Sequence, residues 1–174
     1  MYDREVEVPR LVAKAPERGS GAEVLREASR VLSARYGLLL DSVSLAFYRS
    51  GADSVAPHGD KMGPLRQNTV IAIVSVGEPR RFTLRAVDGS VRTSFALGWG
   101  DLLVMGGNCQ ETFLHGVPKV KHAEPRMSIQ FRQTLPEGLA SGFATGMTTS
   151  LAVRFGKPAF PSHPPELGAR RFTG

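Results

Sequence analysis

The first regular pattern along the chain is helical. Apolar residues recur at intervals of three and four, which puts them on one face of a helix, at Val24, Leu25, Ala28, Val31 and Leu32. Gly37 follows at a position typical of a helix end, because glycine adopts the left-handed backbone without strain. The pattern therefore predicts an amphipathic helix over 22–35 that packs on a sheet.

Beyond this helix the apolar pattern shortens to runs typical of β-strands. Seven strands are predicted, at 43–49, 69–76, 81–87, 91–97, 101–105, 111–115 and 127–133. The run 71–76 is apolar on both faces, as expected of a central strand, and Asp88-Gly89 is typical of a hairpin turn. Residues 43–134 are thus predicted to form one mainly β core, a sandwich or jelly roll. Residues 135–174, rich in Gly, Ser, Thr and Pro, are predicted to form a loosely ordered tail.

Composition narrows the class of protein. The 174 residues, 41% of them hydrophobic and 22% charged, suit one globular domain. A net charge of +6 favours an anionic partner, nucleic acid in particular, although an ordinary basic surface is the alternative. Cys109 is the only cysteine, which excludes an intrachain disulfide and a cysteine-based zinc site. No apolar run approaches the roughly 18 residues of a membrane span. We expect a cytoplasmic monomer with no membrane partner.

Three side chains are candidates for a metal site: His58, Asp60 and His115. Residues two apart on a strand project to the same face, so His58 and Asp60 could offer an imidazole and a carboxylate to one ion, with His115 arriving from a distant strand. Two histidines and one carboxylate leave three positions of an octahedron open, which non-haem Fe(II) needs to hold a co-substrate and O2 together. A His-x-Asp pair alone is weak evidence, because such pairs occur by chance in polar loops.

Two arginines supply a second element of the site. Arg126 and Arg132 are an even number of residues apart, so on a strand they share one face with Ser128 and Gln130. The intervening Met127, Ile129 and Phe131 form the opposite, apolar face. A face that carries two cations suits an anion such as a dicarboxylic acid.

The motifs from Leu45 to Gln133 together resemble the AlkB family of Fe(II)- and 2-oxoglutarate-dependent dioxygenases, over about half of the chain. The residues that carry the resemblance are Phe47-Tyr48-Arg49 before Asp53-Ser54-Val55, then His58-Gly59-Asp60, the run 73–82, Gly100-Asp101-Leu102-Leu103-Val104-Met105, His115-Gly116-Val117-Pro118-Lys119 and the run 126–132. The resemblance implies a double-stranded β-helix (jelly roll) with a short N-terminal helical portion packed on the sheet. It also implies Fe(II), 2-oxoglutarate and O2 as cofactor and co-substrates.

The same resemblance implies a role for each site residue. His58, Asp60 and His115 would hold the iron at the open mouth of the β-helix. Arg126 would pair with the distal carboxylate of 2-oxoglutarate, and Arg132 would lie nearer the end that chelates iron.

Two more residues match positions that help to hold the co-substrate. Tyr48 would do so through its hydroxyl, and Ser128 stands where the family often has Asn. The alternatives are an aromatic that packs on the sheet for Tyr48 and an ordinary strand hydroxyl for Ser128. Ala46 departs from the family, which often has Asn there as a donor to 2-oxoglutarate.

Substrate contacts match the family less well. Residues 1–42 are predicted to hold only part of the family's nucleotide-recognition lid, together with the supporting helix. Either a segment precedes this chain in a longer protein, or the substrate is open. Pro9-Arg10-Leu11 resembles the last part of the lid, which makes Arg10 a candidate substrate contact. Met62 stands where relatives that repair alkylated bases have a carboxylate, so base selection is expected to be relaxed or changed. Arg80 and Arg81 lie in a basic stretch that suits a phosphate backbone, with an ordinary charged face as the alternative.

The leading hypothesis is an oxidoreductase that removes N-alkyl groups from bases in DNA or RNA, single-stranded or flipped out of a duplex, and releases formaldehyde, succinate and CO2. Such an activity would serve the repair of DNA damage. An alternative is a 2-oxoglutarate-dependent hydroxylase of a protein side chain or small metabolite, favoured by Met62 and the short lid. A third possibility is a nucleic-acid-binding module without turnover.

Overall fold

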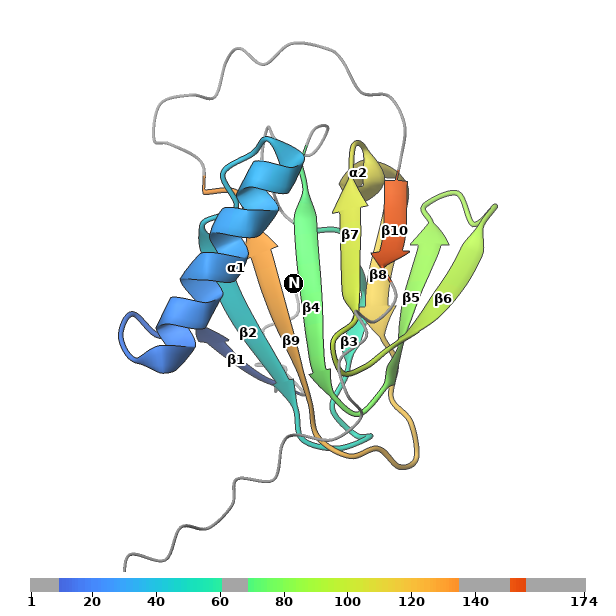
Figure 1. Cartoon of the computed structure of the whole chain (residues 1–174). Coiled ribbons are helices and arrows are strands. Elements are labelled where there is room, and N and C mark those ends of the chain that lie inside the picture. Colours follow the sequence, from blue (N-terminus) through green and yellow to red (C-terminus); the bar gives the residue numbers. More distant parts are fainter. Residues whose placement is uncertain (1–9, 61–68, 135–150, 156–174) are drawn as a thin grey trace, which may run out of the picture.

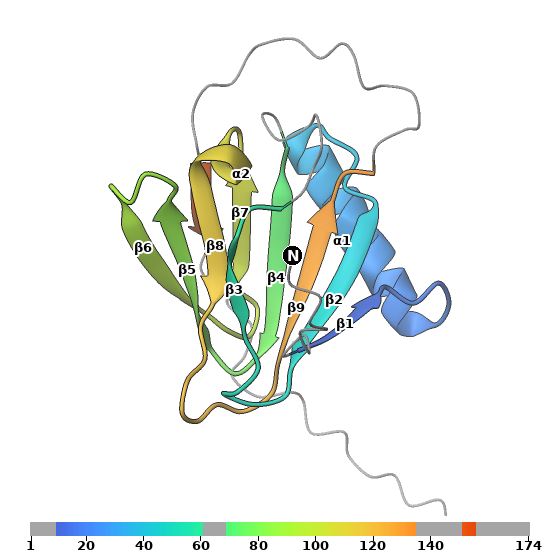
Figure 2. The ribbon, with the colours of Figure 1, turned by 180° about the vertical axis from the view of Figure 1, so that it is seen from behind.

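Two antiparallel sheets face each other in the computed structural model, and one long helix packs on the outside of the larger sheet (Figures 1 and 2). The structure describes residues 10–60, 69–134 and 151–155. The larger sheet has the strand order β1-β2-β9-β4-β7-β10, and the smaller one has the order β3-β8-β5-β6. In chain order, the described helices and strands are β1 (Leu11–Lys14), α1 (Ser20–Tyr36), β2 (Ser42–Tyr48), β3 (Val55–His58), β4 (Ile71–Gly77), β5 (Arg80–Ala86), β6 (Arg92–Leu97), β7 (Leu102–Gly106), α2 (Cys109–Thr112), β8 (Phe113–Val117), β9 (Arg126–Arg132) and β10 (Leu151–Phe155).

The path of the chain between the sheets is that of a jelly roll. From β2 to β5 each strand lies in the sheet opposite its predecessor, β5 and β6 form a hairpin in the smaller sheet, and from β6 to β9 the chain again changes sheet at every step. This order pairs β2 with β9 and β4 with both β9 and β7, so first and last strands of the core are neighbours. The predicted double-stranded β-helix is confirmed.

Strand β4 separates two apolar layers. Its residues Ile71 and Ile73 face the smaller sheet and pack with the cluster between the sheets, whereas Ala72 faces outward and packs under α1. The prediction of a central strand apolar on both faces is therefore confirmed. Strand β9 has the same two-sided character, with Phe131 in the outer layer and Ser128 on the inner face.

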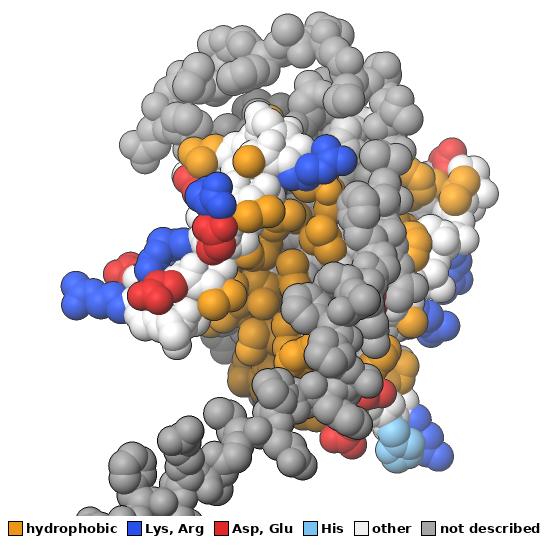
Figure 3. Space-filling model, viewed as in Figure 1, with side chains coloured by type: hydrophobic (Ala, Val, Ile, Leu, Met, Phe, Trp, Pro, Cys, Tyr) orange, Lys and Arg blue, Asp and Glu red, His pale blue; other side chains and the backbone are white. Residues whose placement is uncertain are grey.

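Helix α1 covers part of the outer face of the larger sheet, as predicted. Leu25, Ala28 and Leu32 face the sheet, and the helix ends at Gly37, whose φ of 67° lies in the left-handed region. Val24 and Val31, predicted to belong to the buried stripe, are 67% and 51% exposed because they lie to one side of the face that meets the sheet. Figure 3 shows apolar side chains gathered on the larger sheet beside α1 and charged side chains on the exposed side of the helix.

Four elements differ from the sequence prediction. Strand β1 was not predicted, and a strand at β3 was assumed only for the spacing of His58 and Asp60, because each strand is only four residues long and too short for an alternation to stand out. The strand predicted at 111–115 begins instead with the short helix α2, since the Asn108 carbonyl accepts hydrogen bonds from the amides of Glu111 and Thr112. Strand β10 lies in the stretch predicted as a loose tail; its ladder with β7 corrects that expectation for these five residues. Among the described residues, neither helix is long and apolar enough to cross a membrane.

Candidate metal centre and its cavity

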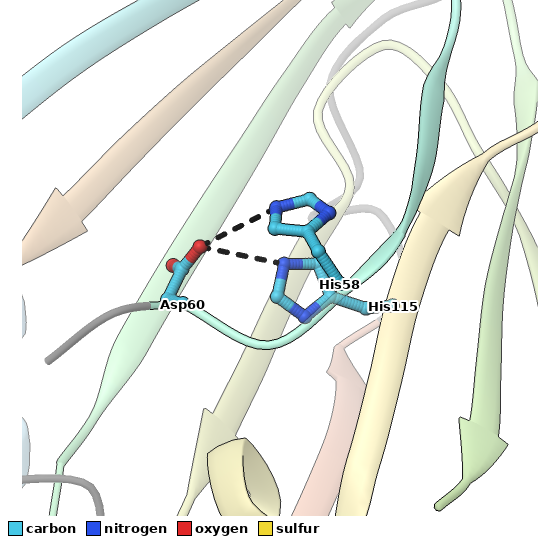
Figure 4. A group of neighbouring side chains, drawn as sticks. All are labelled: His58, Asp60 and His115. Atoms are coloured by element: carbon cyan, nitrogen blue, oxygen red, sulfur yellow. Dashed lines mark ion pairs between the residues drawn. The ribbon is translucent and has the colours of Figure 1, made fainter. Parts of the chain in front are cut away.

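The candidate metal ligands His58, Asp60 and His115 converge at one point between the sheets (Figure 4). Strands β3 and β8 pair so that His58 and His115 lie directly opposite each other, with ring centroids 4.4 Å apart. The Oδ1 atom of Asp60 lies 3.5 Å from Nε2 of His58 and 3.7 Å from Nε2 of His115. One ligand atom from each residue thus falls within 4.8 Å of the others, a spacing that one ion can bridge.

Asp60 reaches this point by a route that strand alternation does not explain. Strand β3 ends at His58, so Asp60 lies beyond the strand, which corrects the predicted geometry. Its carboxylate is held by Arg132, whose Nε and Nη2 lie 2.9 and 2.8 Å from Oδ2. Its backbone amide donates to Oε1 of Gln110 at 3.0 Å. With Oδ2 engaged by the guanidinium, Oδ1 is left facing the two histidines.

The protonation states of this cluster suit a cation. Burial lowers the pKa of His115 to about 4, so its imidazole is neutral and offers a lone pair. Burial acts to raise the pKa of Asp60, but the hydrogen bond with His58 and the nearby charge of Arg132 outweigh it and lower that pKa well below its usual range. The hydrogen bond with Asp60 raises the pKa of His58. A metal ion that binds this imidazole must therefore compete with a proton that His58 holds more tightly than a free histidine does.

The three side chains open on a cavity of about 100 Å³ between the sheets. Its remaining lining residues are Arg10, Tyr48, Val55, Ile73, Phe82, Val117, Arg126, Ser128, Gln130 and Arg132. The predicted polar face of β9 therefore lies on the cavity in full, from Arg126 to Arg132. Among the residues that the structure describes, three guanidinium groups and a single carboxylate line this space, which leaves it strongly positive.

Arg126 has the properties of a carboxylate receptor. It is 1% exposed, and its Nη2 donates to the Ser75 hydroxyl at 2.8 Å. Its Nε and Nη1 are buried and have no hydrogen-bond partner among the described residues. Burial lowers the pKa of Arg126, but a guanidinium is not deprotonated in proteins and remains charged. Two unpaired donors on a buried cation are costly unless an anion accepts from them, so the residues fit a dicarboxylic acid.

A chain of hydrogen bonds runs along the inner face of β2 and β9. Arg132 donates to Ser44 at 3.0 Å, Ser44 donates to Gln130 at 3.3 Å, and Gln130 donates to Ser128 at 3.5 Å. The Ser128 hydroxyl accepts at the end of this chain, so its own proton can be donated into the cavity. Ala46 lies directly opposite Ser128 in the ladder, which makes Ser128 the polar group of that pair.

Tyr48 lines the cavity and lies close to two cations. It is 2% exposed, with the guanidinium carbons of Arg126 and Arg80 at 5.4 and 5.8 Å from its ring centroid. Burial raises the pKa of its hydroxyl, which stays protonated and able to donate. Arg10 lines the same cavity, because the β1–β2 register pairs Leu11 with Phe47 and so carries the preceding arginine toward Tyr48.

The structure corrects one of the predicted substrate contacts and places a second on the outer surface. Arg80 is 2% exposed and donates to the carbonyls of Ser50, Asp53 and Pro118, so it holds three loop segments together and is not free for a substrate. Arg81 is exposed on the outer face of β5, opposite the face on which Phe82 lines the cavity, so it stays a candidate contact for a phosphate backbone but not for a base in the cavity. The predicted contact at Met62 lies outside the described residues.

Three polar residues of the site were not predicted. Ser75 was taken as part of an apolar strand, and only its pairing with Ser128 identifies it as a cavity-side hydroxyl. Ser44 could not be recognised as a site residue from the sequence, because its hydrogen-bond partner Arg132 is 88 residues away. Gln110 was expected next to a strand, and its buried position follows from the unpredicted helix α2.

Comparison with known proteins agrees with this geometry. The sequence profile of the 2OG-Fe(II) oxygenase superfamily matches residues 10–145. The chain belongs to this superfamily. It is 32% identical over 124 residues to the human protein named alpha-ketoglutarate-dependent dioxygenase alkB homolog 3, covering 66% of this chain and 43% of the human one. The mouse protein of the same name is 35% identical over 107 residues, 56% of this chain and 37% of that protein.

The AlkB-like chain spans about half the length, or less, of these curated relatives. A solved structure of a Pseudomonas putida prolyl-4-hydroxylase superposes with a TM-score of 0.49 at 17% identity, over 71% of each chain. The predicted membership of an AlkB-like group of 2-oxoglutarate oxygenases is confirmed.

Proposed function

We propose that this AlkB-like chain is an Fe(II)- and 2-oxoglutarate-dependent dioxygenase. The observation that carries the proposal is one cavity that joins His58, Asp60 and His115 to the buried, partly unpaired guanidinium of Arg126. Two imidazoles and a carboxylate suit Fe(II) with open coordination positions. A buried guanidinium suits the far carboxylate of a dicarboxylic acid.

Each residue then has a separable task. His58, His115 and Oδ1 of Asp60 would hold the iron, and Arg132 would keep the Asp60 carboxylate turned toward it. Arg126 would pair with the distal carboxylate of 2-oxoglutarate, with further donors from the hydroxyls of Tyr48 and Ser128. Iron bound with 2-oxoglutarate and O2 supplies the oxidising chemistry, while the protein orients the reactants and excludes water. No side chain is required as a general acid or base.

The proposal is tested by anaerobic titration of the full chain with Fe(II) and then 2-oxoglutarate. Chelation of iron by the keto acid gives a visible charge-transfer absorption, which we expect to saturate at one equivalent. Arg126→Ala is the matched variant, expected to need more 2-oxoglutarate while it binds iron as the wild type does. A chain that binds neither ligand would overturn the proposal.

For the substrate we propose N-alkylated bases in nucleic acid, with oxidative demethylation as the reaction. Support comes from the similarity to alkB homolog 3 proteins and from the outer face of the smaller sheet. Arg85 and Arg92 are paired across β5 and β6 and both are exposed, with Arg81 on the same face of β5. Like charges directly opposite each other destabilise a sheet, so this face is best matched by a polyanion such as a phosphate backbone.

A binding experiment tests the nucleic-acid part. Replacing Arg81, Arg85 and Arg92 by Gln should weaken binding of a single-stranded oligonucleotide. It should also reduce the slope of the logarithm of the binding constant against the logarithm of the salt concentration by about two to three. The same charge change at Arg18, Arg26 and Arg35, on the α1 side of the molecule, is the control and should have little effect. Methylated oligonucleotides that release formaldehyde would establish demethylation. Substrate-stimulated 2-oxoglutarate turnover by a peptide or metabolite instead would favour the alternative hydroxylase.

A further inference from the structure

Gln110 is the one buried side chain outside the cavity lining that bonds directly to a candidate metal ligand, among the residues that the structure describes. It is 2% exposed and belongs to α2, five residues before His115. Its Oε1 accepts the backbone amide of Asp60 at 3.0 Å, across 50 residues of sequence. Through this bond it connects the segment after β3 to the segment that leads into β8.

The orientation of the Gln110 amide is fixed from both ends. Nε2 donates to the sulfur of Met105 at 3.8 Å, and Oε1 accepts from Asp60. A flipped amide would place its NH2 group against the Asp60 N–H, two donors facing each other, and its oxygen against a thioether that cannot donate. Buried polar groups that are satisfied at both ends hold one geometry, because any other arrangement leaves them unpaired.

Asp60 needs this second anchor because its strand does not hold it. Strand β3 ends at His58, so no ladder bond within the described part of the chain fixes the Asp60 backbone. Arg132 fixes the carboxylate through Oδ2, which leaves the backbone free to pivot about that ion pair. A backbone anchor at the amide removes this freedom and sets the direction in which Oδ1 points.

We propose that Gln110 is a positioning residue for the metal centre, which holds Asp60 in register with His115 so that their ligand atoms stay within reach of one ion. The inference rests on the proposed function. Gln110 does not touch the metal or a substrate, and it acts through the backbone of Asp60. Because α2 continues directly into β8, the bond ties the carboxylate ligand to the strand that bears the second histidine.

The inference is tested on the full chain with Co(II) alone as an oxygen-stable probe. Gln110→Met fills the same space but removes the acceptor, and it should weaken Co(II) binding by about 10- to 100-fold, as loss of outer-shell bonds does elsewhere. It should also change the visible spectrum of the bound ion. Gln110→Glu keeps an acceptor oxygen in the same place and should restore most of the affinity. Thr112→Val is the matched control, because it removes a hydroxyl bond to the Asn108 carbonyl within α2 without touching Asp60.

Hydrogen exchange of the Asp60 amide supplies a readout that needs no metal. The amide should be protected in the wild type and in Thr112→Val, and it should exchange faster in Gln110→Met. Gln110→Asn, which is too short to reach Asp60, replaces Gln110→Met if that variant does not fold. Equal protection and equal Co(II) affinity in wild type and variant would overturn the inference. A wild type that protects the amide but binds no metal would overturn the proposed function and leave the Gln110 contact intact.

Discussion

His58 and His115 lie directly opposite each other on β3 and β8, with their rings 4.4 Å apart. The pairing of two strands that are distant in sequence therefore sets the spacing of the two imidazoles. Asp60 completes the set from outside the ladder, which makes its position depend on side-chain contacts with Arg132 and Gln110. The two kinds of support predict different consequences when each is removed.

Removal of a ligand should abolish iron retention. His58→Ala and Asp60→Ala each leave two of three protein ligands, and we expect no iron to remain after anaerobic loading and desalting. Arg126→Ala should retain iron but weaken the binding of 2-oxoglutarate by at least about 30-fold, since truncating one partner of a buried charge pair costs about 2 kcal/mol or more of binding free energy. Iron content by colorimetric assay and 2-oxoglutarate affinity by calorimetry check the two outcomes. Equal iron content in all three variants would contradict the ligand assignment.

Removal of Arg132, which anchors the Asp60 carboxylate, should weaken metal binding without removing a metal ligand. Arg132→Met breaks the ion pair with Oδ2 of Asp60 and should lower metal affinity by about 10- to 100-fold. Arg49→Met breaks an ion pair of similar length, at 2.8 Å with Asp53, and neither of these two residues lines the cavity. This control should lose stability but bind Co(II) normally. If both variants lose the metal equally, a general loss of folding explains the effect.

A close backbone contact beside His115 should make Gly116 sensitive to substitution. A Cβ atom at this position would lie 2.9 Å from the carbonyl oxygen of Val55 and 3.1 Å from the amide nitrogen of Pro57, where β3 is irregular. Gly116→Ala should therefore destabilise the fold by about 1–3 kcal/mol. Gly21→Ala in α1, where no atom of the described residues lies within 4 Å of the added Cβ, should be neutral or stabilising. Urea unfolding of both variants gives the comparison, and an unchanged Gly116→Ala would show that β3 moves aside freely.

Acid should reveal the contribution of the Asp53 carboxylate to stability. The hydrogen bond with the Arg49 side chain lowers the pKa of Asp53 from 3.8 to about 2. A group with a lowered folded-state pKa stabilises the fold above its ordinary pKa, and this stabilisation is lost as the pH falls through the folded value. The difference in unfolding free energy between wild type and Asp53→Asn should be constant above about pH 5 and should shrink toward about pH 2. A difference that grows on acidification would contradict this assignment.

The sequence predicted those parts of the molecule that repeat a local pattern. The inner face of β9 follows from alternation alone, because Arg126, Ser128, Gln130 and Arg132 are two residues apart and all line the cavity. The central position of β4 follows from its apolar character on both faces. The jelly roll itself was implied by the resemblance to AlkB proteins, and the strand order confirms it.

Contacts made across long stretches of sequence could not be predicted. Ser75 and Arg126 are 51 residues apart, and Gln110 and Asp60 are 50 apart, so neither pair leaves a local pattern. Arg80 illustrates the opposite error. Its charge suggested a surface role, yet three backbone carbonyls accept hydrogen bonds from it in the interior, and only the fold brings those carbonyls together.

The alternation along β9 divides one strand into two independently variable sets of positions. Substitutions at Ser128 or Gln130 alter what the cavity can accept, whereas substitutions at Met127 or Ile129 alter only the layer beside α1. Natural drift or a laboratory library can thus explore new ligands at the even-numbered positions while the odd-numbered ones keep the sheet intact. Residues that determine ligand selectivity thus alternate along β9 with residues that determine stability, so the two properties can evolve separately.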